Sequence, residues 1–145
     1  MDSSPTPDDP LLQARRTAEA MFDDDRASRA LGITVASIAP GRATARMRVT
    51  AAMVNGHAIA HGGYIFLLAD TAFALACNTH GVTVAGAAEI VFVQPARERD
   101  DLIAEAVERV RFGRNGLYDV TVRRGDGAVI AEFRGHSRQL QTRQG

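Results

Sequence analysis

The alternation of hydrophobic and polar positions separates the N-terminal part of the chain into a helical stretch and an extended stretch. Residues 10–30 carry apolar side chains at helical spacing and predict a helix, with a break near Asp23–Asp25. Residues 31–52 predict two strands joined by a turn at Pro40-Gly41, because apolar and polar side chains alternate in the second strand. Residues 1–9 are acidic and rich in proline, and we expect a disordered tail there.

One long apolar run follows, and it predicts a central helix. After a loop that starts near Met53, nearly every residue from Gly63 onward is apolar until Gly81, a natural helix terminator. A helix without a polar face is expected to be buried on all sides. Asp70 interrupts this run, and an ionised carboxylate in apolar surroundings costs several kcal/mol unless it is paired or its pKa shifts.

The remainder of the chain predicts four further strands. Strand-like runs begin near residues 82, 101, 116 and 128, and hairpin turns are indicated by Asn115-Gly116 and Gly125-Asp126-Gly127. The order of elements indicates an α+β fold, in which an antiparallel sheet wraps around the central helix. A further helix lies at the N-terminal end of the chain. No linker divides the chain, so we expect one domain over residues 1–145, with residues 141–145 as a polar tail.

Composition and charge narrow the class of protein. The 145 residues are 46% hydrophobic and 23% charged, which is ordinary for a globular protein. The formal net charge of +0 gives no reason to expect a nucleic-acid or membrane partner. Cys77 is the single cysteine, the N-terminus lacks a signal-peptide pattern, and no apolar run reaches membrane-spanning length. We therefore expect a cytoplasmic protein that uses neither a metal nor another cofactor.

The start of the central helix carries the first candidate chemistry. Gly62 and Gly63 lie where backbone N–H groups lack helical partners and where the helix dipole is positive. Without side chains there, a ligand oxygen can approach these N–H groups closely, as in an oxyanion hole. The alternative is that the two glycines only permit a tight turn into the helix.

The presence of Asp70 in this helix favours an oxyanion hole at the two glycines over a simple turn. A catalytic site made of Asp70 and these glycines requires two subunits. It lies seven residues after Gly63, so the two share one helix face yet stand roughly 10 Å apart along the axis. One scissile carbonyl cannot contact both. Two such helices running antiparallel across a dimer interface would bring Gly63 of one chain level with Asp70 of the other. A structural hydrogen bond to a nearby loop is the alternative role for Asp70.

Two residues ahead of the helix have roles that their spacing leaves open. Asn55 is either a turn cap or a substrate contact. His61 either orients the loop through a ring nitrogen or touches the substrate directly. His80 and Cys77 are interpreted as a helix-end residue and a small core residue.

The motifs together resemble those of the PaaI-type phenylacetic-acid-degradation thioesterases, which are hotdog-fold enzymes that hydrolyse acyl-CoA thioesters. The stretches that carry the resemblance are NGH at residues 55–57, HGG at 61–63, LADTAFA at 68–74 and ACN at 76–78. The likeness covers most of the chain and includes GLYDV and FRGHSR near its C-terminal end. Many hotdog enzymes share HGG alone, whereas its combination with LADTAFA and ACN is specific.

The resemblance implies a role for each candidate residue. Asp70 would be the catalytic carboxylate, either activating water or attacking the thioester carbon. The Gly63 N–H, together with Gly62, would polarise the carbonyl oxygen. Asn55 and His61 would shape the loop that holds the thioester and the water. The family commonly forms a homodimer or homotetramer, with the acyl-CoA substrate at subunit boundaries.

The resemblance also implies the substrate, phenylacetyl-CoA or hydroxyphenylacetyl-CoA, hydrolysed to free acid and CoA. Thr71 would lie beside the acid and bind the water. Tyr64, Phe66 and Phe73 lie near the glycines and the acid, and aromatic walls favour a flat aryl group. For Phe66 and Phe73 the alternative is packing in the core. The rival functions are a broad-specificity medium-chain acyl-CoA thioesterase and a non-catalytic acyl-CoA-binding hotdog protein, whereas a hotdog dehydratase fits the residues less well.

One departure from the family concerns the phosphates of CoA. Relatives often carry an arginine before the proline that closes the strand after the central helix, where this chain has Gln94-Pro95. Arg111, Arg114 and Arg134 are candidate replacements, although a solvated strand edge is the more ordinary role for each.

Overall fold

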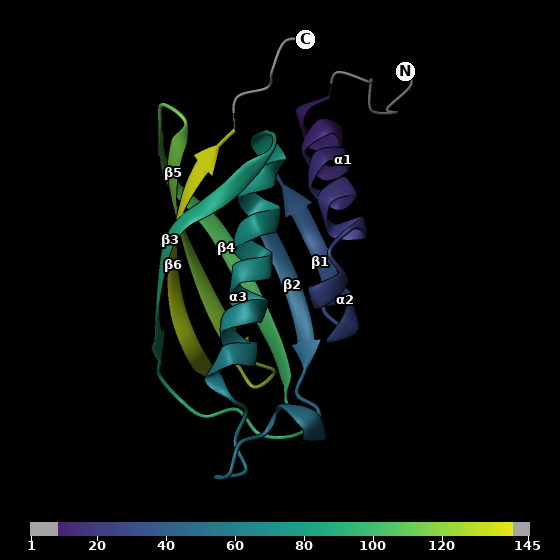
Figure 1. Ribbon diagram of the computed structural model, residues 1–145, viewed down its shortest axis with the longest axis vertical. Coiled ribbons are helices and arrows are strands. Elements are labelled where there is room, and N and C mark those ends of the chain that lie inside the picture. The colour runs from purple at the N-terminus through teal and green to yellow at the C-terminus, as the bar shows by residue number, and fades with distance from the viewer. Residues whose placement is uncertain (1–8, 141–145) are drawn as a thin grey trace.

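Six antiparallel strands curve around one long helix in the computed structural model, which describes residues 9–140 (Figure 1). The strand order across the sheet is β1-β2-β4-β5-β6-β3. The strands are β1 (Thr34–Ala39), β2 (Arg42–Arg48), β3 (Thr83–Phe92), β4 (Asp101–Phe112), β5 (Asn115–Arg124) and β6 (Val129–Gln139). The helices are α1 (Pro10–Asp23), α2 (Arg26–Ala30) and α3 (Gly62–Cys77), with 3₁₀ turns η1 (Ala51–Met53) and η2 (Asn78–His80). The expected α+β fold is confirmed.

The first helix begins at a capped proline. The Asp9 carboxylate accepts a hydrogen bond from the backbone N–H of Leu11 at 2.9 Å, and Pro10 occupies the first helical position. Both features suit a helix start, because proline lacks an N–H that would have no helical partner there. Asp9 therefore belongs to the cap of α1 rather than to a tail. The rest of the expected tails, residues 1–8 and 141–145, lie outside the described residues.

One predicted hairpin turn is wrong by two residues. β4 and β5 are joined at Gly113-Arg114, where Gly113 has a φ of +61°, in the left-handed region that favours glycine. Asn115 and Gly116 already belong to β5, and a Cβ on Gly116 would stand 2.7 Å from Ser137 Oγ. The glycine at this position therefore reflects close packing between β5 and β6. The other two predicted hairpin turns, before β2 and before β6, lie where expected.

The core lies between α3 and the concave face of the sheet. The alternating apolar residues of β2 are buried, as their pattern predicted. The Phe73 ring of α3 contacts Tyr118 and Phe133 at centroid distances of 5.5 and 5.8 Å. Gly135 makes room for this ring, because a Cβ there would stand 2.7 Å from it. These contacts fix the height of α3 over the sheet.

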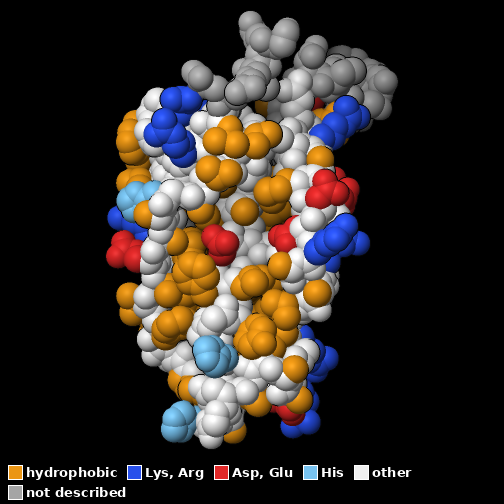
Figure 2. Space-filling view, viewed as in Figure 1, with side chains coloured by type: hydrophobic (Ala, Val, Ile, Leu, Met, Phe, Trp, Pro, Cys, Tyr) orange, Lys and Arg blue, Asp and Glu red, His pale blue; other side chains and the backbone are white. Residues whose placement is uncertain are grey.

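The expectation that α3 is buried on all sides is wrong for the single chain. The sheet lies behind the helix, and α1 and α2 lie to one side of it (Figure 1). A stripe along the remaining face, which we call the open stripe, is exposed or half-buried: Gly63, Phe66, Leu67, Asp70 and Ala74. Figure 2 shows hydrophobic side chains gathered on this face, with isolated acidic groups among them. An apolar surface of this kind is typical of an interaction site.

Strand β3 is a free edge of the sheet. It pairs with β6 on one side only, and none of its ten residues is buried. Large apolar side chains on it are exposed, among them Val91 at 64% and Phe92 at 51%. An unpaired edge of this length offers backbone N–H and C=O groups to another strand.

Candidate active site

The first turn of α3 presents a backbone amide at the surface beside His61. His61 is the N-cap residue, and its Nδ1 accepts a hydrogen bond from the Gly63 N–H at 3.2 Å. Gly63 is exposed, so this amide faces the accessible end of the helix. Through this bond a ring nitrogen of His61 holds the junction between loop and helix, as in the orienting alternative, while direct contact with the substrate stays a prediction.

Gly62 permits a close contact with an aromatic ring. A Cβ on it would stand 2.8 Å from Cζ of Phe92, at the end of β3. The ring forms one wall of a groove of about 450 Å³ beside the start of α3. The groove is mainly apolar, with Asn55 and Gln94 as its polar side chains, and its other lining residues are Ile59, Ala60, Ile65, Val93 and Pro95. Phe92 is absent from the predicted site, because in the sequence it is only one of several apolar residues in its strand.

The loop before α3 is held by its own hydrogen bonds. Asn55 Oδ1 accepts from the backbone N–H groups of His57 at 2.8 Å and Ile59 at 3.4 Å. The backbone N–H of His61 donates to the Met53 carbonyl at 2.7 Å and closes the base of the loop. Asn55 therefore caps a turn, and it also lines the groove.

Asp70 lies half-buried in the middle of the open stripe. Burial raises the pKa of its carboxyl, and the negative charge of Asp25 raises this pKa further. The helix runs without interruption from Gly62 to Cys77, so Asp70 and Gly63 remain roughly 10 Å apart along the axis. A single chain does not bring the acid and the amide to one substrate atom.

Thr71 turns its hydroxyl toward α2 and away from the open stripe. Its Oγ1 donates to the Leu67 carbonyl at 2.8 Å and lies 2.8 Å from Ser28 Oγ. Ser28 Oγ in turn lies 2.6 Å from Oδ2 of Asp25, the N-cap residue of α2. Asp25 and Ser28 are absent from the predicted site. Their spacing indicates a helix cap, but no local signal indicates that this cap packs beside the residue that follows Asp70.

The aromatic residues predicted near the site differ in exposure. Tyr64 and Phe66 are half-buried and pack against the core. Phe66 meets Phe133 edge-on at a centroid distance of 5.4 Å. Phe73 is 1% exposed, so for this ring the core-packing alternative is confirmed.

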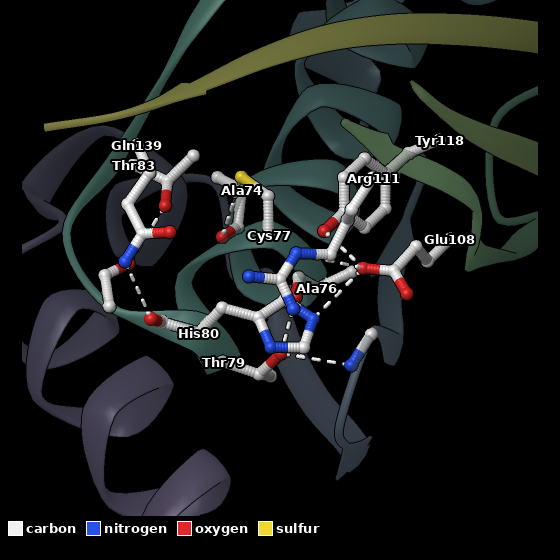
Figure 3. A network of polar contacts seen from close by, with 12 residues as sticks. Ala74, Ala76, Cys77, Thr79, His80, Thr83, Glu108, Arg111, Tyr118 and Gln139 are labelled. Atoms are coloured by element: carbon white, nitrogen blue, oxygen red, sulfur yellow. Dashed lines mark hydrogen bonds and ion pairs between the residues drawn. The ribbon is translucent and has the colours of Figure 1, made fainter. Parts of the chain in front are cut away.

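A polar network fixes the other end of α3. Glu108 Oε1 lies 2.9 Å from His80 Nε2 and accepts a hydrogen bond from the Tyr118 hydroxyl at 3.0 Å (Figure 3). Burial raises the pKa of Tyr118, and the charge of Glu108 raises it further. Cys77 lies in the same region, and burial raises the pKa of its thiol to about 12. Cys77 is therefore a core residue, as predicted.

Two of the three candidate arginines for the CoA phosphates already contact carboxylates. Arg134 donates through Nε and Nη2 to the two carboxylate oxygens of Asp119, at 2.7 and 3.0 Å. Arg111 Nε lies 3.7 Å from Glu108 Oε1. Arg114 is exposed at the turn between β4 and β5. A phosphate bound by Arg111 or Arg134 would compete with an ion pair of the chain.

The groups around the first half of α3 suit the transfer of an acyl group to water. A half-buried carboxylate with a raised pKa can accept a proton, and an amide at a helix N-terminus can stabilise an oxyanion. An apolar groove can hold the acyl group. Across residues 9–140 no group of three or more His, Cys, Asp and Glu side chains is placed to hold a metal ion. No helix within this same range is both long and apolar enough to cross a membrane.

Comparisons with known proteins agree with this chemistry. The model of a family described as the thioesterase superfamily matches residues 57–131. The chain is 42% identical over 129 residues to the acyl-coenzyme A thioesterase PaaI of Escherichia coli (strain K12), covering 88% of this chain and 92% of that protein. The solved structure of the E. coli PaaI protein from the phenylacetic acid degradation operon matches with a TM-score of 0.88 and 41% identity, covering 90% of this chain and 96% of that one. A mutant of the phenylacetic acid degradation protein PaaI from Thermus thermophilus matches with a TM-score of 0.78 and 37% identity, covering 80% of this chain and 100% of that one.

Proposed function

Because the chain belongs to the PaaI-type acyl-CoA thioesterases of the thioesterase superfamily, we propose that its substrate is phenylacetyl-CoA or hydroxyphenylacetyl-CoA. The enzyme is a thioester hydrolase, so an acyl-CoA and water give the free acid and CoA. The aryl acyl group, the residue roles and the assembly described next are parts of the proposal.

In the proposed mechanism Asp70 is the general base. A raised pKa makes a carboxylate a better proton acceptor near neutral pH than a fully solvated aspartate. Asp70 takes a proton from a water molecule whose oxygen bonds to the thioester carbon, and the Gly63 N–H donates to the resulting oxyanion. The C–S bond then breaks, and the CoA thiolate takes up a proton. Direct attack by Asp70 is the other route, and it would form a mixed anhydride that water hydrolyses in a second step.

We assign Asp70 and Gly63 of one site to different subunits of an antiparallel dimer. Their separation of roughly 10 Å along α3 supports this assignment, because a thioester carbonyl cannot contact both within one chain. Two uncovered surfaces of the single chain also support it, namely the open stripe of α3 and the free edge of β3. A second copy related by a two-fold axis presents the same two surfaces in the complementary direction.

The observation that carries the aryl assignment is the ring of Phe92 against Gly62. A thioester whose carbonyl oxygen accepts from the Gly63 N–H would extend its acyl group into the adjacent groove, along this ring. Offset or edge-on contact between two aromatic rings adds about 0.5–1.5 kcal/mol to the burial of their area. The groove of about 450 Å³ falls within the usual range for small-molecule sites.

A panel of esters tests the acyl group. The measurement is kcat/KM for phenylacetyl-, hydroxyphenylacetyl-, hexanoyl- and acetyl-CoA, followed by thiol release. We expect the two aryl esters to exceed hexanoyl-CoA by roughly 10-fold, because one pocket contact discriminates by about 1–3 kcal/mol. Phe92→Leu should lower the ratio of aryl to hexanoyl turnover. Phe112→Leu is the matched control, because Phe112 is 54% exposed at the end of β4 and does not line the groove.

The second candidate function is a broad-specificity medium-chain thioesterase. It is favoured by the aliphatic residues of the groove, Ile59 and Val93, which suit an alkyl chain as well as a ring. If hexanoyl-CoA matches or exceeds both aryl esters, this second function replaces the first. An unchanged ratio of aryl to hexanoyl turnover in Phe92→Leu would remove Phe92 from the acyl site.

A further inference from the structure

Three short contacts lead from Asp25 to the residue beside Asp70. Asp25 Oδ2 lies 2.6 Å from Ser28 Oγ. Ser28 Oγ lies 2.8 Å from Thr71 Oγ1, which lies 2.8 Å from the Leu67 carbonyl oxygen. Each distance is that of a hydrogen bond, and both hydroxyl-bearing residues are buried, at 2% and 5% exposure.

This chain of contacts lacks one proton while Asp25 is ionised. Each hydroxyl supplies one proton, whereas the carboxylate at one end and the carbonyl at the other only accept. Ser28 gives its proton to Asp25, so Thr71 must divide its single proton between the Leu67 carbonyl and Ser28 Oγ. An asparagine at position 25 would supply the missing proton from its amide and is an equally good helix N-cap. Local structure therefore favours an amide where the chain has a carboxylate.

The carboxylate of Asp25 also acts on Asp70 through space. Its negative charge raises the pKa of the Asp70 carboxyl, in addition to the effect of burial. The Cys77 thiol, on the same helix, also feels the charge of Asp70, which raises the pKa of this thiol in addition to the effect of burial. The strands packed against α3 turn Glu108 and Tyr118 toward its far end, where both belong to the His80 network.

From these contacts we infer that Asp25 is a positioning residue for the hydrolysis, acting on Asp70 through its charge and on the Thr71 hydroxyl through Ser28. The inference rests on the proposed function, because it assumes that Asp70 is the general base. It accounts for a carboxylate in a place that suits an amide, since the charge of the carboxylate adds to the effect of burial on the Asp70 carboxyl and an amide would not. Asp25 does not touch the substrate, so its effect is expected in the pH dependence of turnover.

Asp25→Asn separates this role from a structural one. The amide keeps the cap of α2 and donates to Ser28, Ser28 then donates to Thr71, and Thr71 donates to Leu67. We expect the variant to unfold at the same temperature as the wild type or above it. We also expect its Asp70 carboxyl to titrate at lower pH, because a neighbouring negative charge is gone.

The experiment follows the Asp70 carboxyl by ¹³C NMR in protein labelled at aspartate, with Asp70→Asn identifying the signal. Asp24→Asn is the matched control, since it removes the same charge from an exposed residue one position earlier. The expected result is a shift of the Asp70 titration to lower pH in Asp25→Asn, clearly larger than in Asp24→Asn. The acidic limb of kcat/KM should move in the same direction.

Two results overturn the inference. One is an Asp70 titration that is equal in the wild type and Asp25→Asn. The other is a shift of the same size in Asp24→Asn, which would reflect net charge alone. A titration that moves while the acidic limb of kcat/KM stays fixed supports the charge coupling and instead contradicts the assignment of Asp70 as the base.

Discussion

Two glycine-to-alanine substitutions create nearly the same clash but should differ in their effect on stability. A Cβ on Gly135 would stand 2.7 Å from the Phe73 ring, and a Cβ on Gly62 would stand 2.8 Å from the Phe92 ring. The two rings differ in their freedom to move. Phe73 is 1% exposed and enclosed by two other aromatic rings, whereas Phe92 is 51% exposed.

The expected magnitudes follow from that difference. Gly135→Ala forces a buried ring off its site, and overpacking of this kind costs about 1–3 kcal/mol. For a chain of this length, such a loss lowers Tm by about 4–10 °C. Gly62→Ala only swings an exposed ring aside, so the free energy of unfolding should change by less than about 0.5 kcal/mol. The displaced ring would leave the groove wall, and kcat/KM for phenylacetyl-CoA should fall by roughly 10-fold.

Thermal unfolding at one protein concentration and thiol release from phenylacetyl-CoA provide the two readouts. Gly125→Ala is the control, because the nearest atom to its Cβ is the Asp101 carbonyl oxygen at 3.9 Å. A Tm for Gly62→Ala as low as that for Gly135→Ala would refute the argument from ring mobility. Unchanged stability in Gly135→Ala would show that the contact between Phe73 and β6 is looser than these distances indicate.

Three further predictions concern the proposed site. Asp70→Asn should fold and lose turnover by at least about 100-fold, and wild-type turnover in this variant would remove Asp70 from the mechanism. Because the pKa of Asp70 is raised in the folded protein, its carboxyl favours folding at pH values below the unfolded pKa of about 3.9. This contribution to stability is lost as the pH rises through the pKa of the folded protein. Asp70→Asn should therefore raise Tm at neutral pH, with a gain that disappears in acid. Mixing inactive Asp70→Asn with inactive Gly63→Pro should restore activity through hybrid dimers, whereas light scattering that finds an active monomer would contradict the composite site.

The architecture was predictable because the spacing of apolar residues and the positions of turn-forming residues indicate the same elements along most of the chain. The alternation in β2 and the helical run that ends near Gly81 each had one consistent interpretation. The turn at Asn115-Gly116 failed because an asparagine–glycine pair is a strong hairpin signal, and sequence does not reveal that Ser137 fills the space above the glycine. Glycine thus permits close packing at position 116 and a left-handed backbone conformation at position 113.

The candidate site was only partly predictable. Asp70 and the two glycines stand out because each is unusual for a buried helix. Asp25 and Phe92 are ordinary in their local sequence, and their place beside the site comes from how α2 and the end of β3 pack against α3. The apolar pattern of α3 predicted burial on all sides, and the spacing of Gly63 and Asp70 predicted a second copy on the face that is now the open stripe. The apolar pattern alone does not separate the two, since an apolar side chain has the same pattern whether its own chain or a second molecule covers it.

The hydrogen bond from the Gly63 N–H to His61 has a consequence for selectivity between ground state and transition state. An amide that already has a nitrogen acceptor at 3.2 Å gains little by exchanging it for a neutral thioester oxygen. A tetrahedral intermediate carries a full negative charge on that oxygen, and hydrogen bonds to charged acceptors are roughly twice as strong. In the proposed reaction His61 therefore competes with the substrate oxygen for the Gly63 N–H. A neutral thioester oxygen displaces the His61 nitrogen poorly, whereas an oxyanion displaces it readily. Such competition concentrates the binding energy of this one amide in the step where the reaction needs it.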